Sequence, residues 1–265
     1  MLTLIRGAGD IASGIALRLH RAGFRIVMTE VERPTTIRRT VAFSDAVVNG
    51  EQTVEDVTAL RAETWEDACL YLEQGNIPVL VDPGCACREH LKPDALVDAI
   101  LAKRNLGTAI TDAPIVVGVG PGFTAGVDCH AVVETMRGHT LGRAYYEGAA
   151  LPNTNIPGLI GGFAGERVLR APADGTFQST HKIGDLVEVG ETVGLVAGQP
   201  MQATISGVLR GLLANGVPVK KGMKSGDVDP RGERNYCALV SDKALAVGGG
   251  VLEAILHFEA MKYGK

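Results

Sequence analysis

The stretch LIRGAGDIASGIALRLHRAGFRIVMTE, residues 4–30, decides the fold that this sequence predicts. An apolar run leads into a glycine turn, then an amphipathic segment, then a second apolar run that ends on an acid. Gly7, Gly9 and Ala12 fit the G-x-G-x-x-G/A pattern, in which the first glycine forms a tight turn, the second lets a pyrophosphate approach and the third small residue lets the helix pack closely. The residues expected to bind the cofactor here are Gly7, Ala8, Gly9, Asp10, Ile11, Ala12 and Glu30.

Two acids in this stretch point in different directions. Glu30 lies 23 residues beyond Gly7, where the pattern places the acid that accepts hydrogen bonds from ribose hydroxyls. Asp10 follows the second glycine directly, so its carboxylate would repel a pyrophosphate or else satisfy the positive end of the helix dipole itself. The stretch is therefore either a nucleotide-like site or a relic of the fold in which the glycines serve only packing.

Outward from this stretch, apolar runs alternate with amphipathic ones. Apolar runs at 77–83 and 113–120 alternate with amphipathic segments at 35–50 and 91–105, which are interpreted as helical crossovers. Such alternation predicts parallel strands joined by crossovers. We expect an α/β fold, a Rossmann-like doubly wound parallel sheet, with residues 1–150 as a nucleotide- or cofactor-binding domain.

A second glycine loop at 118–126 follows the apolar run 113–120, and a helix is expected over 127–138. In that helix His130 and Glu134 would share a face, as a base and an orienting carboxylate do; the alternative is a histidine that is simply hydrogen-bonded. Loops at the carboxyl ends of parallel strands border the binding crevice, although a tight turn stiffened by proline explains the glycines equally. Candidate cofactor-binding residues here are Gly120, Gly122, Phe123 and Thr124.

Cys85 and Cys87 lie in the cluster 82–90, after another apolar run. Basic neighbours such as Arg88 favour the thiolate, so the pair is a candidate for redox or sulfur-transfer chemistry, with bystander thiols as the alternative. No second cysteine or histidine pair completes a tetrahedral site, so no metal site is predicted. The candidate catalytic residues are Cys85, Cys87 and His130.

The later part of the chain contains an internal repeat. Residues 171–196 align with 203–228 without gaps at an offset of 32, which superposes Gly175 on Gly207 and Gly184 on Gly216. The region resembles the biotinyl/lipoyl-type barrel-sandwich family, but the hairpin at 197–203 lacks the modifiable lysine. We therefore expect a linker over 150–166, a duplicated small β-barrel module over 165–240 inserted into the first domain, and a C-terminal helix within 241–265 that packs back on that domain.

Composition limits the class of protein. Net charge is −4, with 26 basic and 30 acidic residues, which disfavours a nucleic-acid surface or a basic membrane anchor. No leader peptide is apparent and no apolar run is interpreted as a membrane span. Five cysteines without regular spacing favour reduced thiols over a disulfide framework. We expect a cytoplasmic protein.

Several segments together resemble the YqeB family of the selenium-dependent molybdenum hydroxylase system. The most specific is VGVGPGFTAGVDCHAVVETMRGHTLGR at 117–143, and residues 6–30, 97–108, 227–232 and 251–256 extend the resemblance over nearly the whole chain. The α/β half is similar to that of the xanthine dehydrogenase accessory protein. The resemblance implies an accessory or maturation factor that binds molybdenum cofactor (molybdopterin or its dinucleotide) and acts on a client molybdenum hydroxylase; Cys85 and Cys87 could then pass sulfur or selenium to molybdenum.

Three functions remain open from the sequence. The leading one is this maturation factor, the second is an NAD(P)-dependent oxidoreductase with His130 as acid or base, and the third is a non-catalytic nucleotide-sensing protein. Whether the chain is an enzyme is left open. The expected partners are the client hydroxylase, a nucleotide-like small molecule and a second copy of the chain in a homo-oligomer, with no nucleic acid and no membrane.

Overall fold

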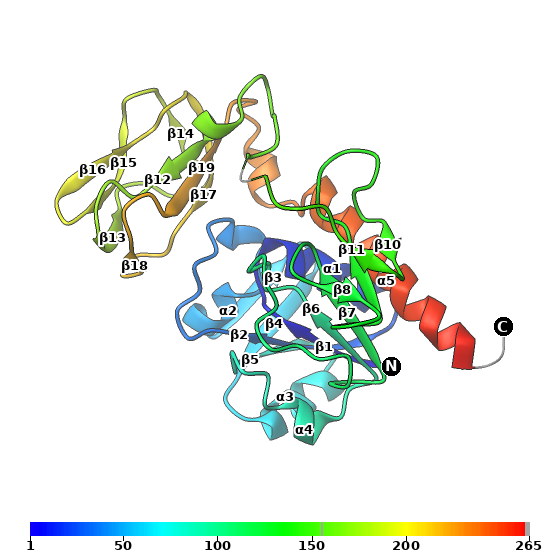
Figure 1. Ribbon diagram of the computed structural model, residues 1–265. Helices are drawn as coiled ribbons and strands as arrows, with labels where there is room; N and C mark the ends of the chain where they lie inside the picture. Colours follow the sequence, from blue (N-terminus) through cyan, green and yellow to red (C-terminus); the bar gives the residue numbers. More distant parts are fainter. Residues whose placement is uncertain (155, 263–265) are drawn as a thin grey trace. The chain divides into compact units, whose positions relative to one another are not determined.

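The computed structural model describes residues 1–154 and 156–262 (Figure 1). The chain forms two compact units: unit 1 comprises Met1–Glu32, Ala42–Asn153 and Val240–Lys265, and unit 2 comprises Arg33–Val41 and Thr154–Leu239. Asn155 of the expected linker and residues 263–265 of the expected C-terminal segment lie outside the described residues.

Unit 1 is built on a nine-stranded sheet of order β10-β9-β7-β6-β1-β2-β5-β4-β3. The strands from β9 across to β4 pair in parallel, while β10 and β3 pair antiparallel at the two edges. The strand bounds are β1 (Leu2–Arg6), β2 (Arg25–Glu30), β3 (Glu51–Val54), β4 (Val57–Ala62), β5 (Ile77–Val81), β6 (Ala95–Asp98), β7 (Ile115–Val119), β9 (Ala131–Val133) and β10 (Ala144–Tyr145). A separate antiparallel pair joins β8 (Thr124–Ala125) to β11 (Gly148–Ala149).

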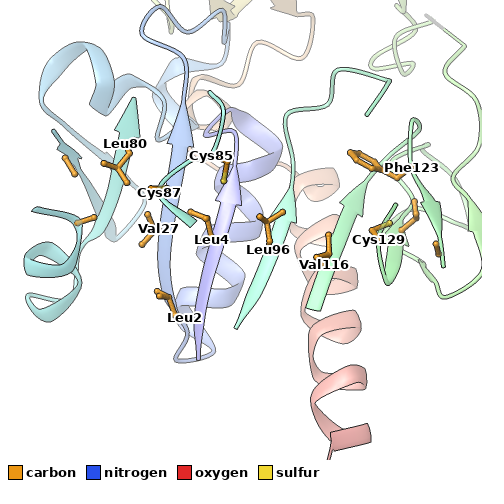
Figure 2. Close-up of a cluster of buried hydrophobic side chains, with 14 of the residues drawn as sticks. Leu2, Leu4, Val27, Leu80, Cys85, Cys87, Leu96, Val116, Phe123 and Cys129 are labelled. Atoms are coloured by element: carbon orange, nitrogen blue, oxygen red, sulfur yellow. The ribbon is translucent and has the colours of Figure 1, made fainter. Parts of the chain in front are cut away.

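The helices of unit 1 are α1 (Asp10–Arg21), α2 (Asp45–Asn49), α3 (Trp65–Glu73), α4 (Arg88–Leu91) and α5 (Asp242–Lys262). Helix α3 begins at a capping box, in which Thr64 and Asp67 each accept a backbone N–H of the other. Helices α1 and α5 cross closely because Gly14 faces Ala244: a Cβ at position 14 would lie 2.5 Å from the Ala244 Cβ. Buried side chains of the central strands, among them Leu4, Leu96 and Val116, form the core on one face of the sheet (Figure 2).

The expected Rossmann-like doubly wound parallel sheet with an inserted small β-barrel is wrong. The sheet is mixed, because a β3–β4 hairpin and strand β10 add antiparallel edges. The segment 91–105, expected as a helix, instead forms β6 and an irregular stretch, and residues 99–114 contain no helix before β7. The segment 127–138, also expected as a helix, contains strand β9. Apolar runs that fit a helix face here fill a buried strand, which periodicity alone does not separate from a helix.

Unit 2 consists of two four-stranded antiparallel sheets. Their orders are β12-β19-β17-β14 and β16-β15-β13-β18. The strands are β12 (Val168–Arg170), β13 (Gly175–Ser179), β14 (Leu186–Val187), β15 (Thr192–Val196), β16 (Gln199–Gln202), β17 (Gly207–Leu212), β18 (Pro218–Val219) and β19 (Lys224–Asp229), with short 3-10 turns at η1 (Arg39–Val41), η2 (Gly165–Arg167) and η3 (Arg234–Cys237).

The 32-residue offset in the sequence is visible in unit 2 as matching strands. Strand β13 pairs with β15 of its own half and β18 of the other, and β17 pairs correspondingly with β19 and β14. Gly175 and Gly207 begin the matching strands β13 and β17 with φ of 154° and 156°. Each half therefore completes the sheet of the other.

Helix α5 is long and apolar enough to cross a membrane by length and composition alone, in contrast to the expectation that no apolar run of the chain reaches that length. Helix α5 packs against α1, and 39% of the residues in its apolar stretch are buried. Such a helix is weak evidence for a membrane span.

Candidate functional site

The polar groups singled out in the sequence gather at one edge of the unit 1 sheet. Because β1, β2, β5, β6 and β7 run parallel, the residues that follow them lie at the same edge. Strand β1 has β2 on one side and β6 on the other, so the chain leaves β1 toward β2 and, after β5, crosses to the opposite side of β1 to form β6. Such a switch point is where ligands bind in open α/β sheets.

The first glycine loop joins β1 to α1. Gly7 has φ of +93°, and its N–H donates to the Thr29 carbonyl at 2.8 Å. Gly9 has an extended φ of −71° and precedes the first residue of α1, Asp10, without a side chain to cap the helix. The amides of the first helical turn have no acceptor within a helix, so this turn presents donors and the positive end of the dipole.

Glu30, the last residue of β2, lies against this loop. Its Oε2 accepts from the Ala8 N–H at 3.0 Å and its Oε1 accepts from the Val31 N–H at 2.7 Å. Burial raises the pKa of Glu30 above its ordinary range, against the two amide donors. The structure therefore brings Glu30 and the Gly7 loop together, as the sequence pattern predicts.

Arg6 and Asp98 form a buried ion pair at the ends of β1 and β6. The Arg6 Nη1 lies 3.1 Å from the Asp98 Oδ2, and Thr108 bonds to both side chains. Arg6 Nη2 also donates to the Pro83 carbonyl at 3.2 Å, whereas Arg6 Nε is buried without a hydrogen-bond acceptor among the described residues. Sequence reasoning missed both residues, although a charged residue that ends an apolar run was a usable signal.

Cys85 and Cys87 lie in the loop from β5 to α4, with both thiols buried. Asp82 organises this loop: its carbonyl accepts the Cys85 N–H at 3.0 Å and its Oδ2 accepts the Cys87 N–H at 2.8 Å. Burial opposes ionisation of Asp82, but these and neighbouring donors outweigh it and lower the pKa of the carboxyl. Figure 2 shows both cysteines near Leu4, Val27 and Leu80.

The second glycine loop begins at the same edge, after β7, but two of its backbone amides already donate to acceptors within the protein. Gly120 N–H donates to the Val133 carbonyl at 2.8 Å, and Thr124 N–H donates to Asp128 Oδ2 at 2.8 Å. A Cβ on Gly122 would lie 2.6 Å from the Arg104 Cα, and Phe123 is buried in the core. The predicted contacts of Gly120, Gly122, Phe123 and Thr124 with a cofactor remain predictions, and the geometry gives each residue a packing role.

His130 and Glu134 do not share a helix face, because they flank the three-residue strand β9. The His130 Nδ1 accepts the Val116 N–H at 2.9 Å, and burial lowers the pKa of the imidazole. Glu134 is fully buried and accepts the N–H groups of Thr135, Met136 and Leu151 at 2.7, 2.7 and 2.8 Å. The expected helical pairing of base and carboxylate is wrong, while a role for His130 itself stays a prediction.

Within residues 1–154 and 156–262, no group of three or more His, Cys, Asp or Glu side chains is arranged to hold a metal ion. The cluster at the strand ends thus offers backbone amides, the half-buried Glu30, the buried Arg6 and two thiols. These groups suit an anionic ligand and sulfur chemistry.

Comparison with known proteins gives one relative at high identity. No protein-family model matches the chain. It is 54% identical over 255 residues to the uncharacterized protein YqeB of Escherichia coli (strain K12), an alignment that covers 96% of this chain and 47% of YqeB. The chain therefore spans about half the length of the curated relative it matches.

Similarity to solved structures is low. A succinylglutamate desuccinylase/aspartoacylase from Rhodobacter sphaeroides matches with a TM-score of 0.23 and 25% identity, over 24% of this chain and 22% of that one. An aspartoacylase family protein from Mesorhizobium loti matches over 86% of this chain and 84% of that one, with a TM-score of 0.27 and 11% identity. Likeness at these TM-scores carries no argument about activity.

Proposed function

We propose that this chain is an accessory factor that binds molybdopterin or its dinucleotide. In this proposal the chain serves the maturation of a molybdenum hydroxylase, including the selenium-dependent kind. The identity to YqeB, which supports membership of the YqeB family, is the ground for the proposal. The molybdenum cofactor is cargo in this proposal. The chain matches about half of YqeB, so any activity that YqeB has as a whole is likewise only proposed for this chain.

The observation that carries the proposal is the position of Glu30 beside the uncapped start of α1. A phosphate group suits the donors and the dipole at a helix N-terminus. The Glu30 carboxylate, which takes one amide on each oxygen, retains lone pairs for the hydroxyls of a ribose. A ligand that carries a phosphate and a nucleoside therefore matches both parts of the site.

The test is a binding titration of the purified chain with molybdopterin cytosine dinucleotide, NADH and NADPH. We expect micromolar binding of the molybdopterin dinucleotide and much weaker binding of both nicotinamide nucleotides. Tight binding of NADH or NADPH with substrate-dependent turnover would instead establish the oxidoreductase. Binding of none of the three ligands would overturn the proposal.

Gly9→Asp sharpens the titration. Gly9 is extended, and aspartate is a favoured residue before a helix, so the variant should fold while its carboxylate repels a phosphate. We expect the Kd for the dinucleotide to rise about tenfold or more. Ala22→Asp adds the same charge at the exposed far end of α1 and is the matched control. Equal affinities of the two variants would place the ligand elsewhere.

A further inference from the structure

The loop between β5 and α4 carries two thiols in a constrained arrangement. Cys85 and Cys87 are 1% and 8% exposed and are separated by one residue, Ala86. In contrast, Pro83, Gly84 and Ala86 of the same loop are exposed. Exposed residues therefore flank both buried cysteines in this loop.

The backbone of this loop is strained at Cys85. Its φ is +57°, in the left-handed region that residues with a Cβ rarely adopt. The conformation is held by Asp82, which binds the N–H groups of Cys85 and Cys87, and by Arg88, whose Nη1 donates to the Cys85 carbonyl at 2.9 Å. Strain of this kind clusters at functional sites, where the surroundings enforce it.

The charges around the pair favour one thiolate and one thiol. The hydrogen bond from Cys87 lowers the pKa of Cys85, with further help from the positive charges of Arg6 and Arg88 and against burial and the charge of Asp82. The same bond and burial raise the pKa of the Cys87 thiol. Arg6 is buried and ion-paired with Asp98, and its Nε has no acceptor among the described residues.

We propose that Cys85 and Cys87 form a redox-active dithiol that reduces small disulfides of the glutathione class, with Cys85 as the attacking and Cys87 as the resolving sulfur. This activity is additional to the proposed cofactor binding and does not depend on it. The geometry that carries it is the placement of both thiols in one loop whose two cysteine amides Asp82 binds, the left-handed Cys85 and the buried guanidinium of Arg6.

The exchange takes two steps. The Cys85 thiolate attacks one sulfur of glutathione disulfide, a mixed disulfide forms, and glutathione leaves as a thiolate that takes the proton of Cys87. The Cys87 thiolate then attacks the Cys85 sulfur, the intramolecular disulfide forms, and the second glutathione leaves and is protonated by water. The two protein thiols are oxidised and glutathione disulfide is reduced to two glutathiones.

The experiment incubates the full chain with glutathione disulfide, quenches it with acid, alkylates the remaining thiols and maps them by mass spectrometry. For the wild type we expect a mass loss of two hydrogens, protection of Cys85 and Cys87 from alkylation, and no retained glutathione. Cys87→Ser should stop at a glutathione adduct on Cys85. Cys85→Ser should form adducts at least about tenfold more slowly, since the attacking thiolate is lost.

Cys129→Ser is the matched control, because Cys129 is also buried and burial raises its pKa to about 11. This variant should form the Cys85–Cys87 disulfide at the wild-type rate. Unfolding midpoints of all variants show whether each one is folded. The proposal is overturned if folded wild type keeps both thiols alkylatable in excess glutathione disulfide, or if Cys85 reacts no faster than the half-buried Cys69.

A second readout separates a reactive pair from a merely buried one. Arg88→Gln removes one positive charge near Cys85 together with the hydrogen bond to the Cys85 carbonyl, and its unfolding midpoint is compared with that of the wild type to show that it is folded. We expect the pH midpoint for Cys85 alkylation to lie below the ordinary cysteine value of about 8.5 in the wild type and to rise in the variant. A wild-type midpoint at or above that value would contradict a resident thiolate.

Discussion

The glycine loop after β1 and the glycine loop after β7 both leave a buried parallel strand at the same edge of the sheet. The first runs into a helix whose opening amides point away from any helical acceptor. The second runs into short strands, and the amides of Gly120 and Thr124 are bonded to Val133 and Asp128. Similar glycine spacing therefore leads into a helix start without a side-chain cap in one loop and serves close backbone packing in the other.

Each loop also has a glutamate beside it. Glu30 bonds to two amides next to the first loop and is held at a raised pKa by burial. Glu134 bonds to three amides beyond the second loop and is fully buried. The difference predicts that Glu134 contributes mainly to stability, whereas Glu30 contributes to binding at little cost in stability.

The largest expected effect is that of Glu134→Ala, which removes the buried carboxylate that three amides donate to. We expect a loss of about 4 kcal/mol in the free energy of unfolding of unit 1. The chain has one tryptophan, Trp65 in unit 1, so its fluorescence during urea unfolding measures this unit alone. Glu134→Gln keeps an oxygen for Thr135 and Met136 and should lose about half as much. Equal, small losses in both variants would contradict the structural role.

Gly122→Ala comes next. Gly122 has φ of +115°, and a Cβ there would lie 2.6 Å from Arg104 backbone, so both strain and overlap oppose the alanine. We expect a loss of about 3 kcal/mol by Trp65 fluorescence. The control is Gly126→Ala in the same loop, where φ is +83° but nothing lies within 4 Å, and about 1 kcal/mol should be lost. Similar losses at both positions would mean that packing against Arg104 is unimportant.

A smaller effect is expected from Glu30→Gln and depends on pH. A carboxyl whose pKa is raised by folding stabilises the protein below the unfolded pKa, and this contribution is lost as the pH rises through the folded pKa. The wild type should therefore lose stability with rising pH above the ordinary glutamate value of about 4.3, and Glu30→Gln should lack this part of the loss. The measurement is the unfolding free energy of both proteins across that window. A difference between them that is constant with pH would exclude a raised pKa.

The smallest effect on stability is expected for Gly9→Asp. An aspartate before α1 caps the helix, so the free energy of unfolding should stay unchanged or rise by about 0.5 kcal/mol. Gly7→Ala is the contrast, since Gly7 has φ of +93° and a Cβ there would lie 3.0 Å from the Ala99 oxygen. Thermal unfolding of both variants checks the pair. A large loss in Gly9→Asp would show that the second glycine, too, is needed for packing.

The local part of the site was accessible to sequence reasoning, and the long-range part was not. The Gly7 turn and Glu30 follow from a pattern that spans one strand, one helix and the next strand. In contrast, Arg6 meets Asp98 across 92 residues, and no periodicity indicates which of many acids lies opposite. The stretch around His130 was misread because β9 is buried on both faces, and a short run of apolar residues fits a helix equally well.

The fold class was wrong for a related reason. The central strands follow from their apolar runs, but the β3–β4 hairpin and the β10 edge depend on pairings that are settled by the assembled sheet. The turn at Glu55 has φ of +55°, but no glycine in the sequence marks this position as a turn. In unit 2 the repeat indicated the glycine turns correctly, yet which half supplies each neighbouring strand is a property of three-dimensional pairing.

The close crossing of α1 and α5 bears on how the chain is made. Residues 22–241 separate the two helices, and at about 5–20 residues per second a ribosome needs on the order of tens of seconds to add them. Throughout that time the Gly14 surface of α1 lacks its partner Ala244. Unit 1 thus completes its fold only when synthesis reaches α5, and until then the nascent chain lacks the helix that covers this surface of α1.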